Sequence, residues 1–295
     1  MDGRYRLFFG TDRPAEALNR DPGADPEKQI AAMRDTIRRP NGGGKAFGPA
    51  RRQPPAMCRP EKIPILRRAI MNLKRLTERV WFYPFEEERD RPNLGYIRGD
   101  NWSMAVDAGH SGGHVAEFYG ALEREGLPLP LLTVLTHWHW DHTFGMHAVH
   151  GLCLAGGRTN AHLADFAERL RNEGAGFFLD MHESIRNEYG DGRPVIVKTA
   201  DIVCPGEVYF DAGNCPIRVF PAVSPHTDDC LLTEIPGEKT LFLGDACGGV
   251  FPTWEKDPDK CRQLALIINA TEAEIFLEGH WTPSTKGETL QDLML

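Results

Sequence analysis

The sequence has no long apolar run, and this excludes a membrane-spanning helix of the usual length. Its longest apolar stretch, residues 127–135, is interrupted by prolines, whereas a helix that crosses a bilayer needs about 20 mostly apolar residues. Residues 1–14 also lack the apolar segment of a secretory signal. We therefore expect a cytoplasmic protein that does not contact a membrane.

Two further absences narrow the class of protein. The seven cysteines are scattered and form no C-x-x-C pair, which favours reduced, buried thiols over a disulfide framework. The formal charge of −8 at pH 7 is not that of a dedicated nucleic-acid binder, although a local basic groove on an acidic protein is compatible with a nuclease. A small-molecule substrate is therefore the expected partner, and nothing in the sequence indicates an oligomeric state.

Residues 1–70 differ in composition from the rest of the chain. Between residues 34 and 62, eight basic side chains stand against two acidic ones, and the runs Gly42-Gly43-Gly44 and Pro54-Pro55 disfavour regular structure. Such a segment buries too little apolar area to offset the entropy of ordering it, so we expect a poorly ordered extension. A basic arm for an acidic partner is the alternative. Because a recognisable domain begins at Met71, a natural start at that residue is a further hypothesis.

From residue 71 to 295 the periodicity predicts alternating strands and helices. An amphipathic helix is expected where Val115, Phe118 and Leu122 share one face, and Gly126 ends it. The other expected helices cover residues 162–172, 180–189 and 258–270. Strands are expected at residues 80–85, 94–98, 102–107, 131–136, 195–198, 217–221, 230–235, 240–243 and 275–278. This is the pattern of an α/β catalytic domain with mixed sheets.

The most informative segment follows the apolar strand at 131–136. It reads His137-Trp138-His139-Trp140-Asp141-His142, with three imidazoles and a carboxylate within six residues. Neutral histidine is a common zinc ligand and carboxylate oxygen a usual companion, so this spacing predicts a metal site rather than a surface histidine cluster. If the segment is extended, the two tryptophans point away from the metal and pack as an apolar brace.

Three isolated residues of the same chemical type follow later strands. His226 comes after the strand at 217–221, Asp245 after Leu241-Phe242-Leu243-Gly244, and His280 after the strand at 275–278 and Gly279. Each follows an apolar run and a small or turn-forming residue, so each is placed at the end of a strand. Alone, each is typical of a cap or a solvated turn. Together, in this order, they predict the remaining ligands of the metal site to which residues 137–142 contribute.

With these motifs the chain resembles the metallo-β-lactamase-fold superfamily, whose five motifs occur in the same order. Asp107, in Val106-Asp107-Ala108-Gly109, matches the first motif, and the segment 137–142 matches the second. His226, Asp245 and His280 match the last three. The resemblance covers residues 73–295 and implies a four-layer αββα sandwich with the site at one edge of the two sheets. The stretch from Val106 to His114 is similar to a generic bacterial branch of the superfamily.

The resemblance also implies a role for each matching residue. His137, His139 and His226 would hold a first metal, and Asp141, His142 and His280 a second, while Asp245 would bridge the two. Asp107 would brace the ligand loop without binding metal. Class B1 and B2 β-lactamases carry a cysteine where this chain has Asp245, so we do not expect antibiotic hydrolysis by their route.

These assignments predict an enzyme with two zinc ions, or iron or manganese in their place. A hydroxide between the two metals would act as the nucleophile, with Asp141 orienting it, on a small ester, thioester, lactone or amide. Two alternatives on the same fold stay open: a phosphodiesterase or nuclease, and an oxidoreductase with one iron, similar to a persulfide dioxygenase. Specificity is expected in residues 174–187 and 248–259. Trp254 and Trp281 are candidates for the wall of the site, whereas His182 is expected to be an ordinary surface or helix residue.

Overall fold

The computed structural model describes residues 8–9 and 71–294. The predicted basic extension therefore lies outside the described residues, except for β1 (Phe8–Phe9), which pairs antiparallel with β9 (Val208–Asp211). The predicted start of the catalytic domain at residue 71 stays a prediction.

The first sheet is mixed, as the sequence predicts. Its strands lie in chain order; β2 to β5 pair antiparallel, and β5 to β8 pair parallel. They are β2 (Lys74–Arg75), β3 (Val80–Tyr83), β4 (Leu94–Arg98), β5 (Ser103–Val106), β6 (Leu132–Val134), β7 (Leu152–Gly156) and β8 (Ile202–Cys204). The short β6 is buried throughout, as its apolar sequence indicates for a strand covered on both faces.

The second sheet contains β1 and the strands that follow β8 in the chain. Its order is β1-β9-β10-β11-β12-β13-β14, and only β12 and β13 pair parallel among its described strands. The remaining strands are β10 (Pro216–Pro221), β11 (Leu231–Ile235), β12 (Thr240–Gly244), β13 (Ile275–Glu278) and β14 (Ser284–Thr285). Apart from β1, the chain thus completes the first sheet before it builds the second.

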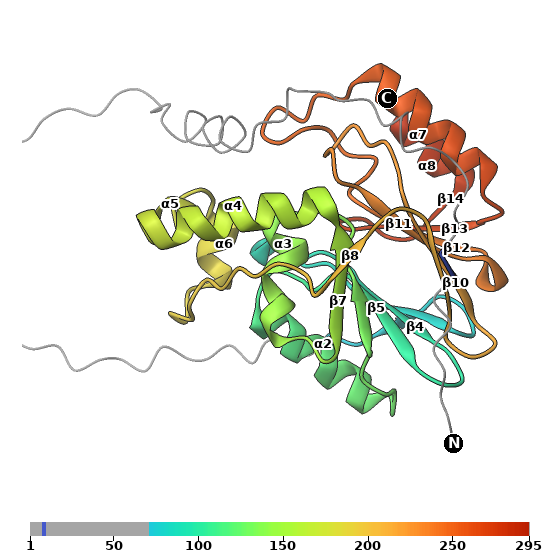
Figure 1. Cartoon of the computed structure of the whole chain (residues 1–295), viewed down its shortest axis with the longest axis horizontal. Coiled ribbons are helices and arrows are strands. Elements are labelled where there is room, and N and C mark those ends of the chain that lie inside the picture. The colour runs from blue at the N-terminus through green and yellow to red at the C-terminus, as the bar shows by residue number, and fades with distance from the viewer. Residues whose placement is uncertain (1–7, 10–70, 295) are drawn as a thin grey trace, which may run out of the picture.

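The two sheets pack face to face with helices outside each of them (Figure 1). The first sheet carries α2 (Gly112–Arg124), α4 (Gly157–Glu173), α5 (Gly176–Leu179) and α6 (Glu183–Glu188), and the second carries α7 (Pro258–Ala270) and α8 (Lys286–Leu293). Met104 and Leu277 belong to the apolar core between the sheets, whereas Phe118 of α2 and Leu264 of α7 belong to outer cores. The predicted four-layer αββα sandwich is confirmed.

One predicted strand is wrong. Residues 195–198 run without strand pairing, and the strand beside β7 is instead β8, a few residues later. The alternation that suggested a strand has another cause, because Val195 and Val197 pack against the apolar cluster under α4. Strand β7 and helix α8 are not predicted from the sequence, because their apolar patterns are too short to give a clear period.

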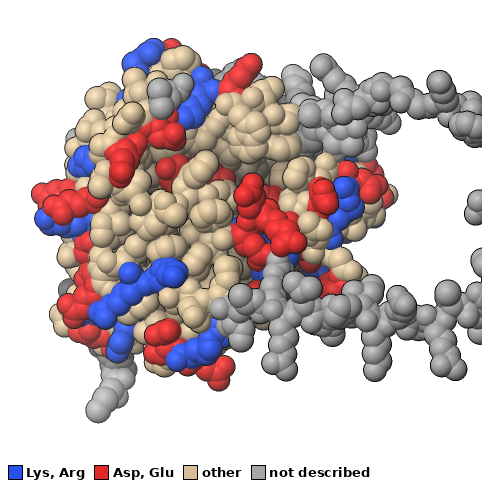
Figure 2. Space-filling view, turned by 180° about the vertical axis from the view of Figure 1, so that it is seen from behind, with Lys and Arg blue, Asp and Glu red and all other residues tan. Residues whose placement is uncertain are grey.

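The distribution of charge on the surface and the state of the cysteines agree with the expectations from composition. On the face drawn in Figure 2, the coloured Lys and Arg side chains lie in small groups separated by acidic or uncharged residues. In the described part of the chain, no helix has the length and apolar character needed to cross a bilayer. The six cysteines of the described residues are buried and free of disulfides, as predicted; the cytoplasmic location stays a prediction.

A buried ion pair fixes the loop before β4 to α6. Arg91 and Glu188 are both fully buried side chains, and Nε and Nη2 of Arg91 donate to the two carboxylate oxygens of Glu188 at 2.7 and 2.9 Å. Truncating one partner of such a pair leaves a buried charge without its main counterion, which costs more than the intact pair contributes. The pair therefore holds Asp90, which precedes Arg91, in a fixed place.

We expect Glu188→Ala to lower the free energy of unfolding by about 3 kcal/mol because it leaves the Arg91 guanidinium buried without its bidentate partner. Urea denaturation followed by circular dichroism would measure this. Glu183→Ala, in the same helix but exposed, is the matched control and should change stability by less than about 0.5 kcal/mol. Equal effects of the two variants would contradict the assignment.

Candidate metal centre

The structure brings all seven predicted ligand residues together at one edge of the sandwich. They form two groups, and within each group one potential ligand atom per residue lies within 4.8 Å of the others. The first group is His137, His139 and His226, and the second is Asp141, His142, Asp245 and His280. The loop after β6 supplies four of these residues, and strand ends of the second sheet supply the other three.

In the first group, the imidazole nitrogens of His139 and His226 converge. Nδ1 of His139 lies 3.0 Å from Nε2 of His226. The other ring nitrogen of His226, Nδ1, donates to the carbonyl of Gly249 at 2.7 Å, which leaves Nε2 with a free lone pair in the neutral ring. His137 is buried, and its Nε2 has no hydrogen-bond partner among the described residues. A buried nitrogen without a partner, as in His137, calls for an explanation. A cation bound between it and the converging nitrogens of His139 and His226 would provide one.

The second group contains both carboxylates. Oδ2 of Asp141 lies 3.1 Å from Nε2 of His142 and 3.0 Å from Nε2 of His280. Asp245 faces both groups: its Oδ1 is 3.4 Å from Nε2 of His142, and its Oδ2 is 3.7 Å from Nε2 of His226. Its position between the two groups agrees with the predicted bridging role, which stays a prediction.

Two glycines allow this close approach. A Cβ added to Gly279 would lie 2.2 Å from Oδ1 of Asp245 and 2.8 Å from Cε1 of His142. Gly244 has a φ of +55°, and its added Cβ would lie 2.4 Å from Oγ1 of Thr136. The small residue that precedes each of the two ligand-type side chains in the sequence is therefore required by contact, and at Gly244 also by backbone conformation.

Asp107 makes hydrogen bonds to the ligand loop that agree with its predicted bracing role, which stays a prediction. Its carboxylate accepts from Nδ1 of His142 at 2.8 Å and from the backbone N–H of Thr136 at 2.8 Å. The Thr136 hydroxyl also donates to it, at 2.9 Å to Oδ2. Asp107 itself adopts a left-handed φ of +65°, a conformation that costs free energy and is found at functional sites. The role of Thr136 is not predicted from the sequence, because this residue belongs to none of the motifs.

The electrostatics of the site favour cation binding. Burial lowers the pKa values of His137 and His139 well below the usual range, so both rings are neutral ligands at pH 7. Burial opposes the charged forms of Asp141 and Asp245, but neighbouring histidines, chiefly His142, hold the pKa of each carboxyl well below its usual range. Neutral imidazoles and ionised carboxylates are the ligand set of zinc and similar divalent ions, so the residues fit the predicted metals.

His280 and His142 hold a proton when no cation is bound. Burial opposes a charge on His280, yet Asp245 and Asp141 raise its pKa to about 9. The same carboxylates overcome the burial of His142 and raise its pKa well above the usual value. Ligation requires a free lone pair on each ring, so cation binding would release these protons.

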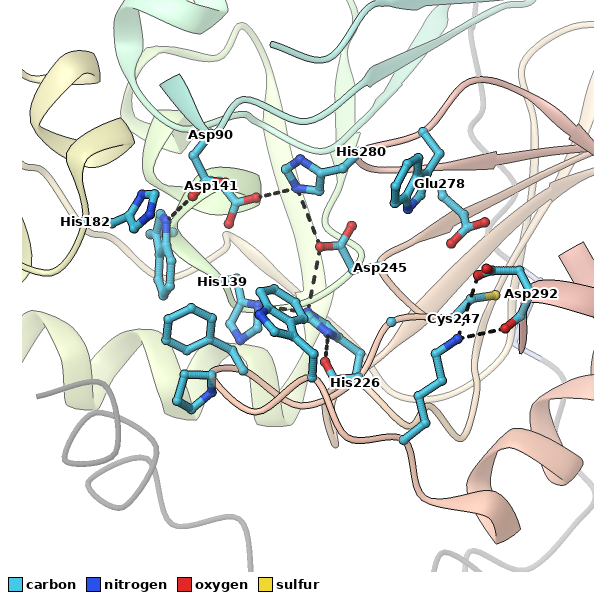
Figure 3. Close-up of a pocket in the computed structure, with 18 of the residues that line it drawn as sticks. Asp90, His139, Asp141, His182, His226, Asp245, Cys247, Glu278, His280 and Asp292 are labelled. Atoms are coloured by element: carbon cyan, nitrogen blue, oxygen red, sulfur yellow. Dashed lines mark hydrogen bonds and ion pairs between the residues drawn. The ribbon is translucent and has the colours of Figure 1, made fainter. Parts of the chain in front are cut away.

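A cavity of about 700 Å³ opens beside the two groups. Figure 3 shows His139, His226, Asp245 and His280 at its centre, with Asp90 and His182 on one side and Cys247, Glu278 and Asp292 on the other. Asp141, Trp140 and both expected wall residues, Trp254 and Trp281, also line it. Residues 174–187 and 248–259 contribute to the lining, and their expected role in specificity stays a prediction.

Two residues near the site differ from the sequence-based expectation. His182 is an exposed residue that caps α6 by accepting from the backbone N–H of Ser184, as expected for a surface or helix residue, but it also lines the cavity. Trp138 is buried in the apolar core as expected, but Trp140 also lines the cavity. The physical reason is that a short helix, α3 (Trp140–Thr143), begins at Trp140, so the alternation of an extended chain ends there.

A family model of the metallo-beta-lactamase superfamily matches residues 88–280, more than half of the chain. The chain belongs to this superfamily. The predicted membership is thereby confirmed, and the metallo-beta-lactamase superfamily consists mostly of hydrolytic enzymes, with some members of other activity.

Several solved metallo-beta-lactamase structures are similar in fold. One from Pontibacter korlensis is 16% identical with a TM-score of 0.55, over 76% of this chain and 98% of that one. DIM-1 is 17% identical with a TM-score of 0.52, over 76% and 96%. FIM-1 from Pseudomonas aeruginosa, in a mono-zinc form, is 14% identical with a TM-score of 0.52, over 76% and 93%. No curated protein matches the sequence.

The brace gives a test with an internal control. Thr136→Val removes the hydroxyl that donates to Asp107 and leaves a buried acceptor short of one bond, so it should lower the free energy of unfolding by about 1–3 kcal/mol. Thr133→Val, on β6, removes a buried hydroxyl that has no hydrogen-bond partner among the described residues, so it should be neutral or stabilising. Denaturant titration of both variants checks this, and the reverse order of stability would refute the brace.

Proposed function

We propose that the protein is a dinuclear metal-dependent hydrolase that binds two zinc ions. His137, His139 and His226 would hold the first ion, Asp141, His142 and His280 the second, and Asp245 both. The observation that carries this proposal is the position of Asp245 between the two groups. Its Oδ2 lies 3.7 Å from Nε2 of His226 in the first group and 3.6 Å from Nε2 of His280 in the second, and its Oδ1 lies 3.4 Å from Nε2 of His142. A pair of cations that shares a ligand is the arrangement used to clamp a reacting oxygen in hydrolysis.

The metal ions, Asp141 and Asp107 would each have a separate role in the reaction. Metal ions held here would lower the pKa of a water to about 7 and polarise the carbonyl of the substrate. Asp141 contacts His142 and His280 through Oδ2, so Oδ1 is the oxygen that would accept a proton from the attacking water. Asp107 would keep His142 in place through its hydrogen bond to Nδ1, which fixes the orientation of the ring.

The cavity supports a small ester, thioester, lactone or amide as the substrate. Its volume suits a small molecule, and much of its lining is apolar. Apart from the proposed ligands, it presents the carboxylates of Asp90, Glu278 and Asp292 but a single lysine, Lys256. This balance of charge disfavours a polyanionic nucleic acid and leaves the carbonyl compounds as the better match.

The test couples metal content to turnover. Purified protein should contain about two equivalents of zinc and hydrolyse members of a panel of phosphodiesters, thioesters, esters, lactones and β-lactams. His139→Ala should abolish hydrolysis, lower the zinc content and reduce the rise in melting temperature on adding zinc, because it removes a ligand. Elemental analysis and calorimetry measure the last two effects independently of activity.

His147→Ala is the matched control, because the ring of His147 lies outside the site and bonds within its own turn to the carbonyl of Phe144. It should keep both zinc and turnover. One equivalent of iron without zinc would replace the hydrolase with the oxidoreductase alternative. Full turnover by His139→Ala would refute the ligand assignment.

A further inference from the structure

One wall of the cavity is a continuous row of aromatic rings. Trp140 and Phe251 meet edge to face with centroids 5.8 Å apart, and Phe251 meets Trp254 in the same way at 5.5 Å. Trp254 also stacks on His226, with centroids 6.4 Å apart and the planes 18° from parallel. The row therefore leads from the cavity wall directly to a proposed metal ligand.

Trp254 is held in a way that packing alone does not explain. Trp254 is 59% exposed, although tryptophan residues are highly buried on average. Its φ of +58° lies in the left-handed region, which is strained for a bulky side chain. A hydrogen bond from the backbone N–H of Trp254 to the carbonyl of Val250 at 2.8 Å maintains this turn. Strain and exposure together indicate that the ring is presented to a ligand.

The two ends of the cavity differ in polarity. At the aromatic end, the indole N–H of Trp140 donates to Oδ2 of Asp90 at 2.9 Å, so one carboxylate stands beside the rings. At the other end, Nζ of Lys256 donates to the carbonyl of Asp292 at 2.8 Å, and the carboxyl of Glu278 also lines the cavity. The proposed metal ligands lie between the ends (Figure 3).

We propose that the aromatic end binds an uncharged aromatic group of the substrate and that Trp254 determines this specificity. The inference rests on the proposed function and narrows its substrate class to aryl-bearing carbonyl compounds. Aromatic rings favour edge-to-face and stacked contacts with one another. Trp254 and Phe251 could each make such a contact with a ring of the substrate. Among the lining residues no Lys or Arg stands at this end, and the Asp90 carboxyl lies beside the rings, so this end favours an uncharged aromatic group.

Three methyl esters that differ only in their acyl group would test the proposal: methyl acetate, methyl phenylacetate and methyl 4-carboxyphenylacetate. With the zinc-loaded full chain, kcat/KM for the phenylacetate should exceed that for each of the other two by at least about tenfold. Trp254→Gly should reduce this preference by about tenfold, mainly through KM, because glycine adopts the left-handed conformation without strain. Its melting temperature should be unchanged or higher, which a structural role of the indole would not allow.

Two further variants serve as controls. Trp254→Phe keeps an aromatic ring and should retain most of the preference. Leu266→Ala removes an apolar side chain that is 70% exposed on α7, outside the cavity, and should leave the preference unchanged. Equal kcat/KM values for acetate and phenylacetate in the wild-type protein would overturn the inference while the proposed hydrolase stands.

Binding separates the inference from the proposed function. Phenylacetone is neutral and cannot be hydrolysed, and its affinity for the zinc-loaded chain can be measured by isothermal titration calorimetry beside acetone. It should bind more tightly than acetone, and Trp254→Gly should weaken it by about tenfold. If no carbonyl compound is turned over but this binding is observed, the hydrolase proposal fails and the aromatic site stands. Equal affinities for the two ketones would overturn the aromatic site.

Discussion

The structure depends on the burial of two carboxylates, Asp141 and Asp245, among five imidazoles. Taking a carboxylate out of water is costly unless opposite charge and hydrogen bonds compensate for the lost hydration. In this protein the histidines supply part of that compensation, and two of them hold protons that a cation would displace. The glycines at the strand ends and the Asp107 brace serve the same requirement, because the seven groups fit only if nothing else occupies the space between them.

Much of this site could be predicted because its residues carry strong local signals. The spacing of His137, His139, Asp141 and His142 is dense enough to indicate a metal without any knowledge of the fold. The isolated residues His226, Asp245 and His280 became informative through their positions after apolar strands, and the carboxyl ends of these strands do meet at one edge. Asp107 was placed through the family resemblance, and its hydrogen bonds agree with that placement.

The parts that were missed depend on contacts between distant segments. Asp90 lines the cavity because the buried pair of Arg91 and Glu188 holds its loop against α6, and no local pattern encodes such a pair. The alternation at residues 195–198 is that of a strand, but tertiary packing uses it to cover an apolar cluster instead. Trp140 reaches the cavity because a helix begins at that residue, which a reading of alternating side chains does not foresee.

The origin of the seven side chains has a consequence for how the molecule assembles. Each group combines residues from the loop after β6, in the first sheet, with residues from the second sheet. Neither sheet alone offers more than two donors to either group, so a cation would cross-link the two halves of the sandwich. Acquisition of the ions would then belong to the last stage of folding, after the sheets have docked, and their loss would loosen the docked interface before either sheet came apart.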